Sequence, residues 1–412
     1  MAESSIQSDP TAAVDPIPSA PRAAYAQLAA ALGHSGMTVQ RYYLLHVLGA
    51  IFPLAAGLVM YGWRAALAMI AVLVSAAGAI FVWRRIGLRG GQLRYAHVLW
   101  LALLLAMMLP ATLASRFVLD ASAHWPILPL AGVMLAIFCW LLGGLGAGRI
   151  HPVVTTYLVI VVLYGGINPM TPRQVLQRNE VGRGDLMDVG RAPPALTAQD
   201  AWTKRPIVPD HSATAEVPAS QFLSEYTTGR VSPDRVWLSL EGLLRDRLPP
   251  LEDLILGATP GPIGTGSAIA IIIGGLLLLY RGLIDFRIPL ITVVVAMVAL
   301  LVLPVPVVIT DHPEWRWLAG HVRGIGWSMG VTFVNYEILA SPLLFTAFFL
   351  ATSPSTRPLT RRGRVIYAML IGMLAAVFQL YVSVAFGPYL ALMTASLLTP
   401  TLDKWLRPRA LV

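Results

Sequence analysis

The sequence has 412 residues, of which 56% are hydrophobic and only 12% are charged, with a formal net charge of +9. A soluble globular domain is usually about one-quarter charged, so this composition excludes an ordinary soluble protein and indicates a chain that lies in lipid. The single cysteine, Cys139, lies in an apolar run. It excludes an internal disulfide and a cysteine-ligated metal site within the chain.

Ten apolar segments follow one another along the chain. A helix needs about 20 residues to cross the hydrocarbon core of a bilayer, and most of the segments approach that length. They cover approximately residues 43–62, 65–83, 96–114, 126–146, 152–167, 265–280, 288–308, 328–351, 365–384 and 387–402. This pattern predicts an all-α polytopic membrane protein with about ten transmembrane helices.

Basic residues are spread unevenly over the connections between these segments. If the N-terminus lies inside, sixteen Lys and Arg residues fall on the inside and four fall in the short outside loops. Inside connections carry the excess of basic residues, so both termini are predicted to be cytoplasmic. This topology explains the positive charge without a nucleic-acid partner. The predicted organisation is a disordered cytoplasmic tail, five helices, an extracytoplasmic loop, five helices and a second tail, over residues 1–41, 42–167, 168–256, 257–405 and 406–412.

The loop between the fifth and sixth segments is the longest connection. Within it, "SPDRVWLSLEGLLRDRL" (232–248) has apolar residues at helical spacing, which favours a short amphipathic helix near the membrane surface. The two sets of five helices start on opposite sides, and glycine-rich elements recur in both, as "LLGGLGAGRIHPV" and "LGATPGPIGTGSA". A 5+5 inverted repeat, which places a site between the halves, is therefore a further expectation.

The stretch "LILGATPGPIGTGSAIA" (254–270) is a glycine-rich loop that leads into the sixth segment. It lacks the lysine of a P-loop and the glycine spacing of a Rossmann fingerprint. Two interpretations remain open. The N–H groups and positive dipole end of the following helix suit a ligand or a phosphate. Alternatively, the small residues form a turn and let helices pack closely.

Few ionisable residues fall inside the apolar segments. Glu337, in "MGVTFVNYEILASP", is the one clear acid there and is a candidate for an ion path. The alternative is that its helix begins later, which leaves Glu337 at the membrane interface. His46 and His97 lie near the first and third segments, where a haem would need two facing histidines, but no other feature supports one. His151, before Pro152, is either functional or an interfacial capping residue.

Several stretches carry a family pattern in collinear order over about residues 42–405. They are "LALLLAMMLP", "WLLGGLGAGRIHPV", "LGATPGPIGTGSAIAIIIGGLLLLYR", "FFLATSPSTRPLTRRGRVIYAMLIG" and "PYLALMTASLLTPTLD". Together they resemble the RnfD/NqrB family, membrane subunits of the Rnf and Na⁺-translocating NADH:quinone oxidoreductase complexes. Three polar positions of the family pattern differ, because Thr265 replaces a glutamate, Ser353 an aspartate and His151 an asparagine.

The resemblance implies a flavoprotein subunit in the bacterial inner membrane, with other membrane and peripheral subunits of a redox complex as partners. Family members carry FMN ester-linked to a threonine in the loop between spans five and six, and NqrB-type members are also associated with riboflavin. Thr214, in "DHSAT", is the best acceptor here by position. The glycine loop is expected to contact flavin through Gly257, Thr259, Gly261, Gly264, Thr265 and Ser267.

The function expected is that of an integral membrane subunit of an Rnf/Nqr-like electron transport complex. Such a subunit binds flavin and passes electrons, and it is a candidate for coupling to ion translocation. Whether the chain transfers electrons itself or is a non-catalytic subunit stays open. One alternative is a family member without flavin that anchors redox partners, with residues 168–250 as a docking surface. A second alternative is a secondary transporter built from inverted repeats.

Overall fold

The computed structural model describes twelve stretches of the chain. They are residues 39–85, 95–110, 126–142, 150–167, 218–227, 240, 243–244, 248–259, 261–308, 313–317, 327–354 and 356–406. The described part is mostly helical, and its helices are rich in Leu, Val, Ile and Ala. Thr214, and most of the amphipathic helix expected over 232–248, lie outside these residues.

The first half of the chain contributes four apolar helical elements. They are α2 (Val39–Arg85), α3 (Tyr95–Met108), α5 (Ile127–Leu141) and α6 (Pro152–Ile167). α2 is two helices joined at Gly62, where φ is 68° and ψ is −162°. A residue with a side chain strongly disfavours that conformation, so the glycine sets the break. The two parts are separately long enough to cross a membrane, over Arg41–Trp63 and Ala65–Arg85.

The second half contains more elements, of which the longer helices are apolar. They are α10 (Ala219–Thr227), α12 (Leu251–Leu256), α13 (Ala268–Tyr280), α14 (Arg287–Val302), α15 (Trp327–Ala340), α16 (Leu343–Phe345), the π-helix η4 (Thr346–Leu350), α17 (Arg361–Tyr381) and α18 (Gly387–Trp405). Strands β1 (Pro304–Val308) and β2 (Pro313–Trp317) form an antiparallel hairpin, in which Pro304 pairs with Trp317 and Val308 with Pro313.

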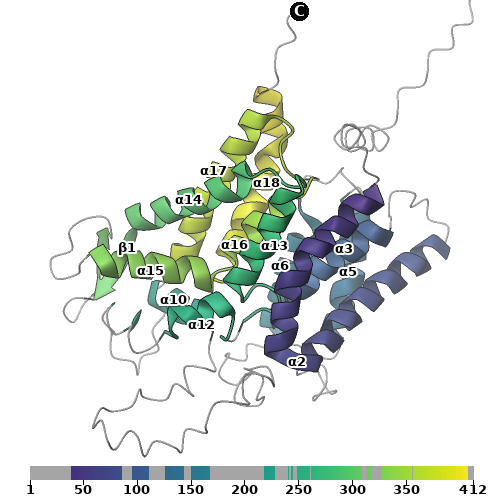
Figure 1. Ribbon diagram of the computed structural model, residues 1–412, viewed down its shortest axis with the longest axis horizontal. Helices are drawn as coiled ribbons and strands as arrows, with labels where there is room; N and C mark the ends of the chain where they lie inside the picture. The colour runs from purple at the N-terminus through teal and green to yellow at the C-terminus, as the bar shows by residue number, and fades with distance from the viewer. Residues whose placement is uncertain are drawn as a thin grey trace, which may run out of the picture.

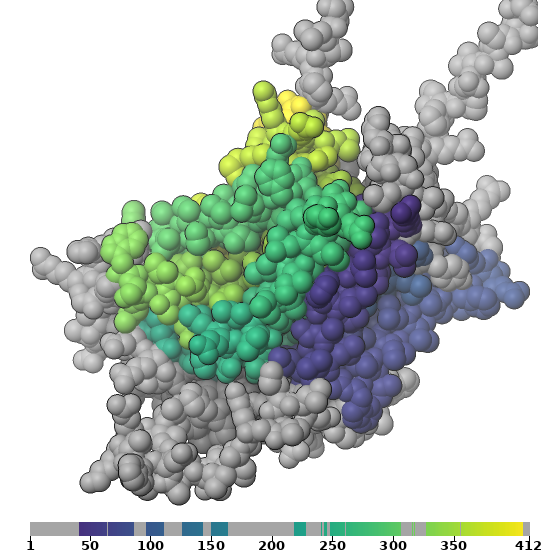
Figure 2. Space-filling view, viewed as in Figure 1, coloured from purple at the N-terminus to yellow at the C-terminus, as the bar shows by residue number. Residues whose placement is uncertain are grey.

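Figure 1 shows the first-half helices (purple to blue) beside the second-half helices (green to yellow). The halves meet where α13 packs against α2 and where α18 touches α6. α13 and α2 cross closely, because a Cβ atom on Gly274 would overlap the carbonyl oxygen of Gly49. Small residues at a crossing let two backbones approach. The space-filling view shows the surfaces of the two helices in continuous contact (Figure 2).

The described helices follow the predicted segments with three differences. The seventh was expected to reach residue 308, but α14 ends at Val302 and a β-strand follows, because Pro304 and Pro306 have no N–H to continue a helix. The eighth was expected as one helix, but it breaks before Leu343 with a bend of 61°. The helices α10 and α12 were not predicted. Residues 111–114 and 143–146, at the ends of two expected helices, lie outside the described residues.

The length and the apolar composition of the helices identify this chain as a membrane protein. Within the described ranges, three helices are long and apolar enough to span a membrane, or four when the bent pair is taken as one span. Five shorter apolar helices accompany them, over Ala96–Met108, Ile127–Leu141, Pro152–Leu163, Ala268–Tyr280 and Arg287–Val302. The chain is therefore a multi-pass, mostly α-helical membrane protein.

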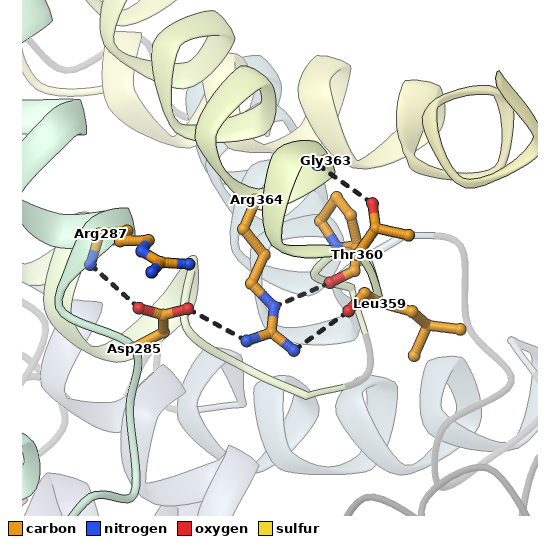
Figure 3. Close-up of polar contacts among 7 residues, drawn as sticks. Asp285, Arg287, Leu359, Thr360, Gly363 and Arg364 are labelled. Atoms are coloured by element: carbon orange, nitrogen blue, oxygen red, sulfur yellow. Dashed lines mark hydrogen bonds and ion pairs between the residues drawn. The ribbon is translucent and has the colours of Figure 1, made fainter. Parts of the chain in front are cut away.

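A polar corner joins the turn before α14 to the start of α17 (Figure 3). The guanidinium of Arg364 forms an ion pair with the carboxylate of Asp285 at 3.0 Å and also donates to the carbonyl oxygens of Pro358 and Leu359. The hydroxyl of Thr360 accepts a hydrogen bond from the N–H of Gly363 and caps α17. The stretch "RPLTRRGR" thus has a structural role at this corner.

Ionisation of Asp285 depends on the same corner. Partial burial by itself raises the pKa of this carboxyl group. Hydrogen bonds from the Arg364 side chain and the Arg287 backbone N–H, together with the positive charges of both arginines, outweigh burial and hold the pKa below its ordinary value. The carboxylate form therefore stabilises the folded state.

Candidate functional site

The glycine loop, residues 257–267, connects α12 to α13. It starts at Gly257, which ends α12 in the left-handed conformation with φ of 88°. The N–H groups of Gly257 and Ala258 both donate to the carbonyl oxygen of Asp253 at 2.8 Å. The loop ends at Ser267, whose hydroxyl caps α13 by accepting from the N–H of Ala270 and donates to the carbonyl of Ile255. Both ends of the loop are thus fixed by contacts within the protein.

The middle of the loop pairs with the end of α3. The N–H of Ile263 donates to the carbonyl of Leu109 at 3.1 Å, and the N–H of Gly264 donates to the carbonyl of Met107 at 2.8 Å. Gly264 is required there, because an added Cβ would lie 2.6 Å from the Met107 side chain. Gly57 of α2 also approaches the loop so closely that a Cβ would overlap the carbonyl oxygen of Ile263. Packing explains these two glycines.

Two other glycines of the loop are not explained by packing. A Cβ added to Gly261 or to Gly266 would meet only ordinary contacts, the hydroxyl of Tyr61 being 3.8 Å away in both cases. That hydroxyl donates to the carbonyl oxygen of Thr259 at 2.9 Å and supports the loop from α2. Gly261 and Gly266 could therefore accept a Cβ atom beside Tyr61, and packing alone does not require glycine at these two positions.

The hydroxyl-bearing residues of the loop are buried. Thr259, Thr265 and Ser267 are 7%, 6% and 6% exposed. Thr265 lies beside the phenol of Tyr389 on α18, but the two hydroxyls are not within the distance and angle of a regular hydrogen bond. Tyr389 in turn makes an edge contact with Tyr157 of α6, with ring centroids 5.0 Å apart. Thr265 thus faces a buried, polar and aromatic environment between the two halves of the chain.

A second group of polar residues converges at the beginnings of three helices. We call His46, His97 and His151, with Tyr42, Tyr43 and Trp100, the histidine cluster. All six are buried or nearly so. His46 contacts the rings of Tyr42 and Trp100, and His97 contacts the ring of Tyr43, at centroid distances of 4.2, 5.6 and 5.2 Å. His151 lies within electrostatic range of His97.

Many polar atoms of the histidine cluster are unsatisfied within the described part of the chain. They are the Tyr42 hydroxyl, Nε2 of His46, Nδ1 of His97 and both ring nitrogens of His151. Nδ1 of His46 is different, because it lies 2.9 Å from the carbonyl of Tyr42. The described residues contain no group of three His, Cys, Asp or Glu side chains arranged to hold a metal ion. The cluster can instead donate and accept hydrogen bonds to water or to a ligand.

Glu337 lies on α15 and is fully buried, with 0% of its surface exposed. α15 begins at Trp327, so the acid lies well inside the helix and not before it. Neither carboxylate oxygen has a hydrogen-bond partner among the described residues. Glu337 is therefore a buried acid, as opposed to an interfacial one.

The chain was compared with known proteins. Residues 29–412 match the NQR2, RnfD, RnfE family. The chain belongs to this family. The RnfD protein of the ion-translocating oxidoreductase complex of Halorhodospira halophila is 32% identical over 155 residues, which is 38% of each chain. The corresponding protein of the Na(+)-translocating ferredoxin:NAD(+) oxidoreductase complex of Acetobacterium woodii is 28% identical over 165 residues, which is 39% of this chain and 43% of the relative.

A third relative in the NQR2, RnfD, RnfE family matches over nearly its whole length. The RnfD protein of the ion-translocating oxidoreductase complex of Yersinia pseudotuberculosis serotype I is 26% identical over 392 residues, which is 91% of this chain and 95% of the relative. The first two relatives are matched over only about two-fifths of their length. The family is thus shown along nearly the whole chain, while the stronger identity is confined to a part of it.

The glycine loop of this family member was predicted from the sequence, whereas the histidine cluster was not. The loop is contiguous in sequence and easily recognised. The members of the cluster come from three helices, and only the fold brings them together. The signal available in the sequence was the presence of His46, His97 and His151 next to the ends of apolar segments. Thr214 lies outside the described residues, so the structure does not relate it to the loop.

Proposed function

We propose that this protein is an integral membrane subunit of an Rnf/Nqr-like electron transport complex. The observation that carries the proposal is family membership over residues 29–412. The names of the relatives support it, because they describe components of ion-translocating oxidoreductase complexes. Other membrane and peripheral subunits of that complex are the partners that we propose.

We further propose ten membrane crossings in the bacterial inner membrane, with both termini in the cytoplasm. The two parts of α2, then α3, α5, α6, α13, α14, the bent unit of α15 to η4, α17 and α18 make ten apolar helical units. The distribution of Lys and Arg supports the orientation. An inverted 5+5 repeat agrees with the packing of α13 against α2 between the halves.

The cofactor that we propose is a flavin, FMN or riboflavin, held on the Gly261 and Gly266 side of the glycine loop. The proposal rests on these two glycines, which packing does not require, and on the buried hydroxyl of Tyr389 beside Thr265. A bound flavin accepts and passes on electrons, while the protein supplies position and electrostatics. Thr214 is the residue that we propose for covalent attachment of FMN.

A second candidate function is a membrane anchor without flavin. The loop favours it in one respect, because the N–H groups of Gly257, Ala258, Ile263 and Gly264 already have partners within the protein. These groups are not free to bind a phosphate. The residues Thr265 and Ser353, where the family pattern has acids, point in the same direction.

Flavin fluorescence in a denaturing gel separates these proposals. We expect a fluorescent band at the mass of this chain in the wild-type complex, and its loss in Thr214→Ala. Ser212→Ala, two residues away, is the matched control and should keep the band. A band that survives Thr214→Ala refutes the attachment site. Absence of flavin from both the gel and the extract of the purified complex favours the anchor.

A further inference from the structure

The membrane-embedded part of the second half contains a broken helix. α15 ends at Ala340, and α16 starts at Leu343 in a direction that differs by 61°. Pro342 lies between them and has no N–H to continue the helix. The hydroxyl of Ser341 donates to the carbonyl of Ile338 at 3.2 Å and accepts from the N–H of Leu343. Broken helices in membrane proteins expose backbone polar groups where ions or substrates bind.

Glu337 is three residues before Ala340, the last residue of α15, and therefore close to this break in sequence. It is fully buried, and both of its carboxylate oxygens lack a partner in the described ranges. Burying an unpaired ionised carboxylate costs several kcal/mol, so the ionised form needs a bound cation and the neutral form needs a bound proton. Glu337 is therefore a binding site for a cation or for a proton.

The charged groups on the neighbouring helices do not supply a counter-ion. α15 packs against α10, α12, α14 and α16. The charged residues on these elements are Glu225, Glu252, Asp253 and Arg287, and none of them forms a hydrogen bond with the carboxylate of Glu337. Glu225 accepts a hydrogen bond from Gln221. Glu252 is exposed at the surface.

A proton suits this environment better than a metal cation. Hard cations take several oxygen ligands in a closed shell. Here one carboxylate is accompanied by one further unpartnered buried oxygen near the break in sequence, the hydroxyl of Thr346. A protonated carboxyl group is neutral and can be buried without a counter-ion.

We propose that Glu337 is the proton-binding site of the broken helix, and that the ion carried at this place is H⁺. The step is a simple protonation, in which the carboxylate takes up one proton, becomes a neutral carboxyl group and later releases the same proton. No electron is transferred in it. The inference rests on the proposed function, since it names the ion for a component of an ion-translocating complex.

Carbodiimide labelling tests the inference on the intact complex in its membrane. Dicyclohexylcarbodiimide reacts with protonated carboxyl groups in apolar surroundings, and mass spectrometry identifies the modified peptide. At neutral pH we expect Glu337 to be modified to the same extent in NaCl and in KCl of equal ionic strength. Glu337→Gln should lose the label, while Glu252→Gln, the exposed control on α12, should keep it. Absence of labelling, or protection by Na⁺, overturns the proposal.

The labelling of Glu337 and the flavin content of the complex test the two proposals separately. If Glu337 is labelled but the complex contains no flavin, the proposed electron-transfer function fails and the proton site stands. If flavin is present and Glu337 is not labelled, the proton site fails and the proposed function stands. Proton uptake during turnover gives a second measurement, and we expect its loss in Glu337→Gln while chemical reduction of the bound flavin is unchanged.

Discussion

The glycine loop and the histidine cluster differ in how their polar atoms are used. In the loop, the N–H groups of Ile263 and Gly264 bind carbonyl oxygens of α3 and of the residue that follows it, and Tyr61 binds the carbonyl of Thr259. In the cluster, the Tyr42 hydroxyl and both nitrogens of His151 have no partner among the described residues. The segment that is easiest to recognise in the sequence is thus largely occupied with holding the fold, while the cluster is not.

A motif that is easy to recognise in the sequence is therefore not necessarily the part of the protein with polar atoms left to bind a ligand. A family motif can persist because it fixes a turn between two helices, and such a motif then leaves few groups for a ligand. Buried polar atoms without partners cost about 1–3 kcal/mol each, so they are the atoms with hydrogen-bonding capacity left for water or a ligand. Next to the loop, the same criterion selects the hydroxyl of Tyr389 on α18. Gly261 and Gly266 are candidates on a different ground, since packing does not require glycine at either position.

The largest effect is expected from Gly57→Ala. The new Cβ overlaps the carbonyl oxygen of Ile263, so α2 and the loop must separate. Overpacking of this kind costs up to about 3 kcal/mol and occasionally more, and we expect a lower midpoint of thermal unfolding in detergent. Gly78→Ala, on the same helix element with nothing within 4 Å, is the control and should be neutral or stabilising. Equal behaviour of the two variants would contradict the structural role of the loop.

The next largest loss of stability is expected at the polar corner, where the polar side chains already have hydrogen-bond partners. Arg364→Leu removes the ion pair with Asp285 and two hydrogen bonds to carbonyl oxygens. We expect a loss of about 2 kcal/mol in the free energy of unfolding, measured by denaturant titration. Arg362→Leu changes an exposed arginine on the same helix and should cost less than about 0.5 kcal/mol.

The corner also predicts a dependence on pH. The folded-state pKa of Asp285 is lowered, so its contribution to stability is present above the unfolded value of about 3.9 and is lost as pH falls through the lower folded value. The wild-type protein should lose more stability than Asp285→Asn in this acid range. A parallel decline of the two proteins would show that the ion pair does not stabilise the fold.

Much of the fold was predictable from the sequence, because apolar runs of helix length are a local property. The segment 152–167 coincides with α6. The end of α14 was missed because Pro304 and Pro306 interrupt a run that is otherwise apolar. The break before Leu343 was missed for a similar reason, since a single proline within an apolar stretch is compatible with a straight or a bent helix.

The site was less predictable, because partners are set by tertiary contacts. The sequence placed glycines at 257–267, but it did not show that Gly264 is required by Met107 while Gly261 is not. Nor did it show that His46, His97 and His151 lie in one cluster. Distances between residues on different helices follow from packing, which hydropathy does not encode.

A smaller effect is expected from Tyr61→Phe. This change leaves the buried carbonyl oxygen of Thr259 without the hydroxyl that binds it at 2.9 Å. The expected loss is about 1 kcal/mol, measured as the unfolding midpoint of the purified chain. A variant as stable as the wild type would mean that the loop does not depend on α2 for its support.

The smallest effect is expected from Tyr42→Phe, which is the same chemical change made in the histidine cluster. The hydroxyl of Tyr42 has no partner among the described residues, so its removal should change the free energy of unfolding by less than about 0.5 kcal/mol or stabilise the fold. A loss as large as that of Tyr61→Phe would show that water or a ligand already satisfies this hydroxyl.

The most direct measurement is the flavin content of the purified complex with Gly261→Val in this chain. A Cβ at Gly261 has no neighbour closer than 3.8 Å among the described residues, and the unfolding midpoint of the variant, measured alongside, separates a loss of flavin from a loss of the fold. We predict that the wild-type chain carries flavin whose absorption is bleached by a reductant, and that Gly261→Val loses it. Flavin absent from the wild-type chain, or fully retained by Gly261→Val, would contradict the proposed site.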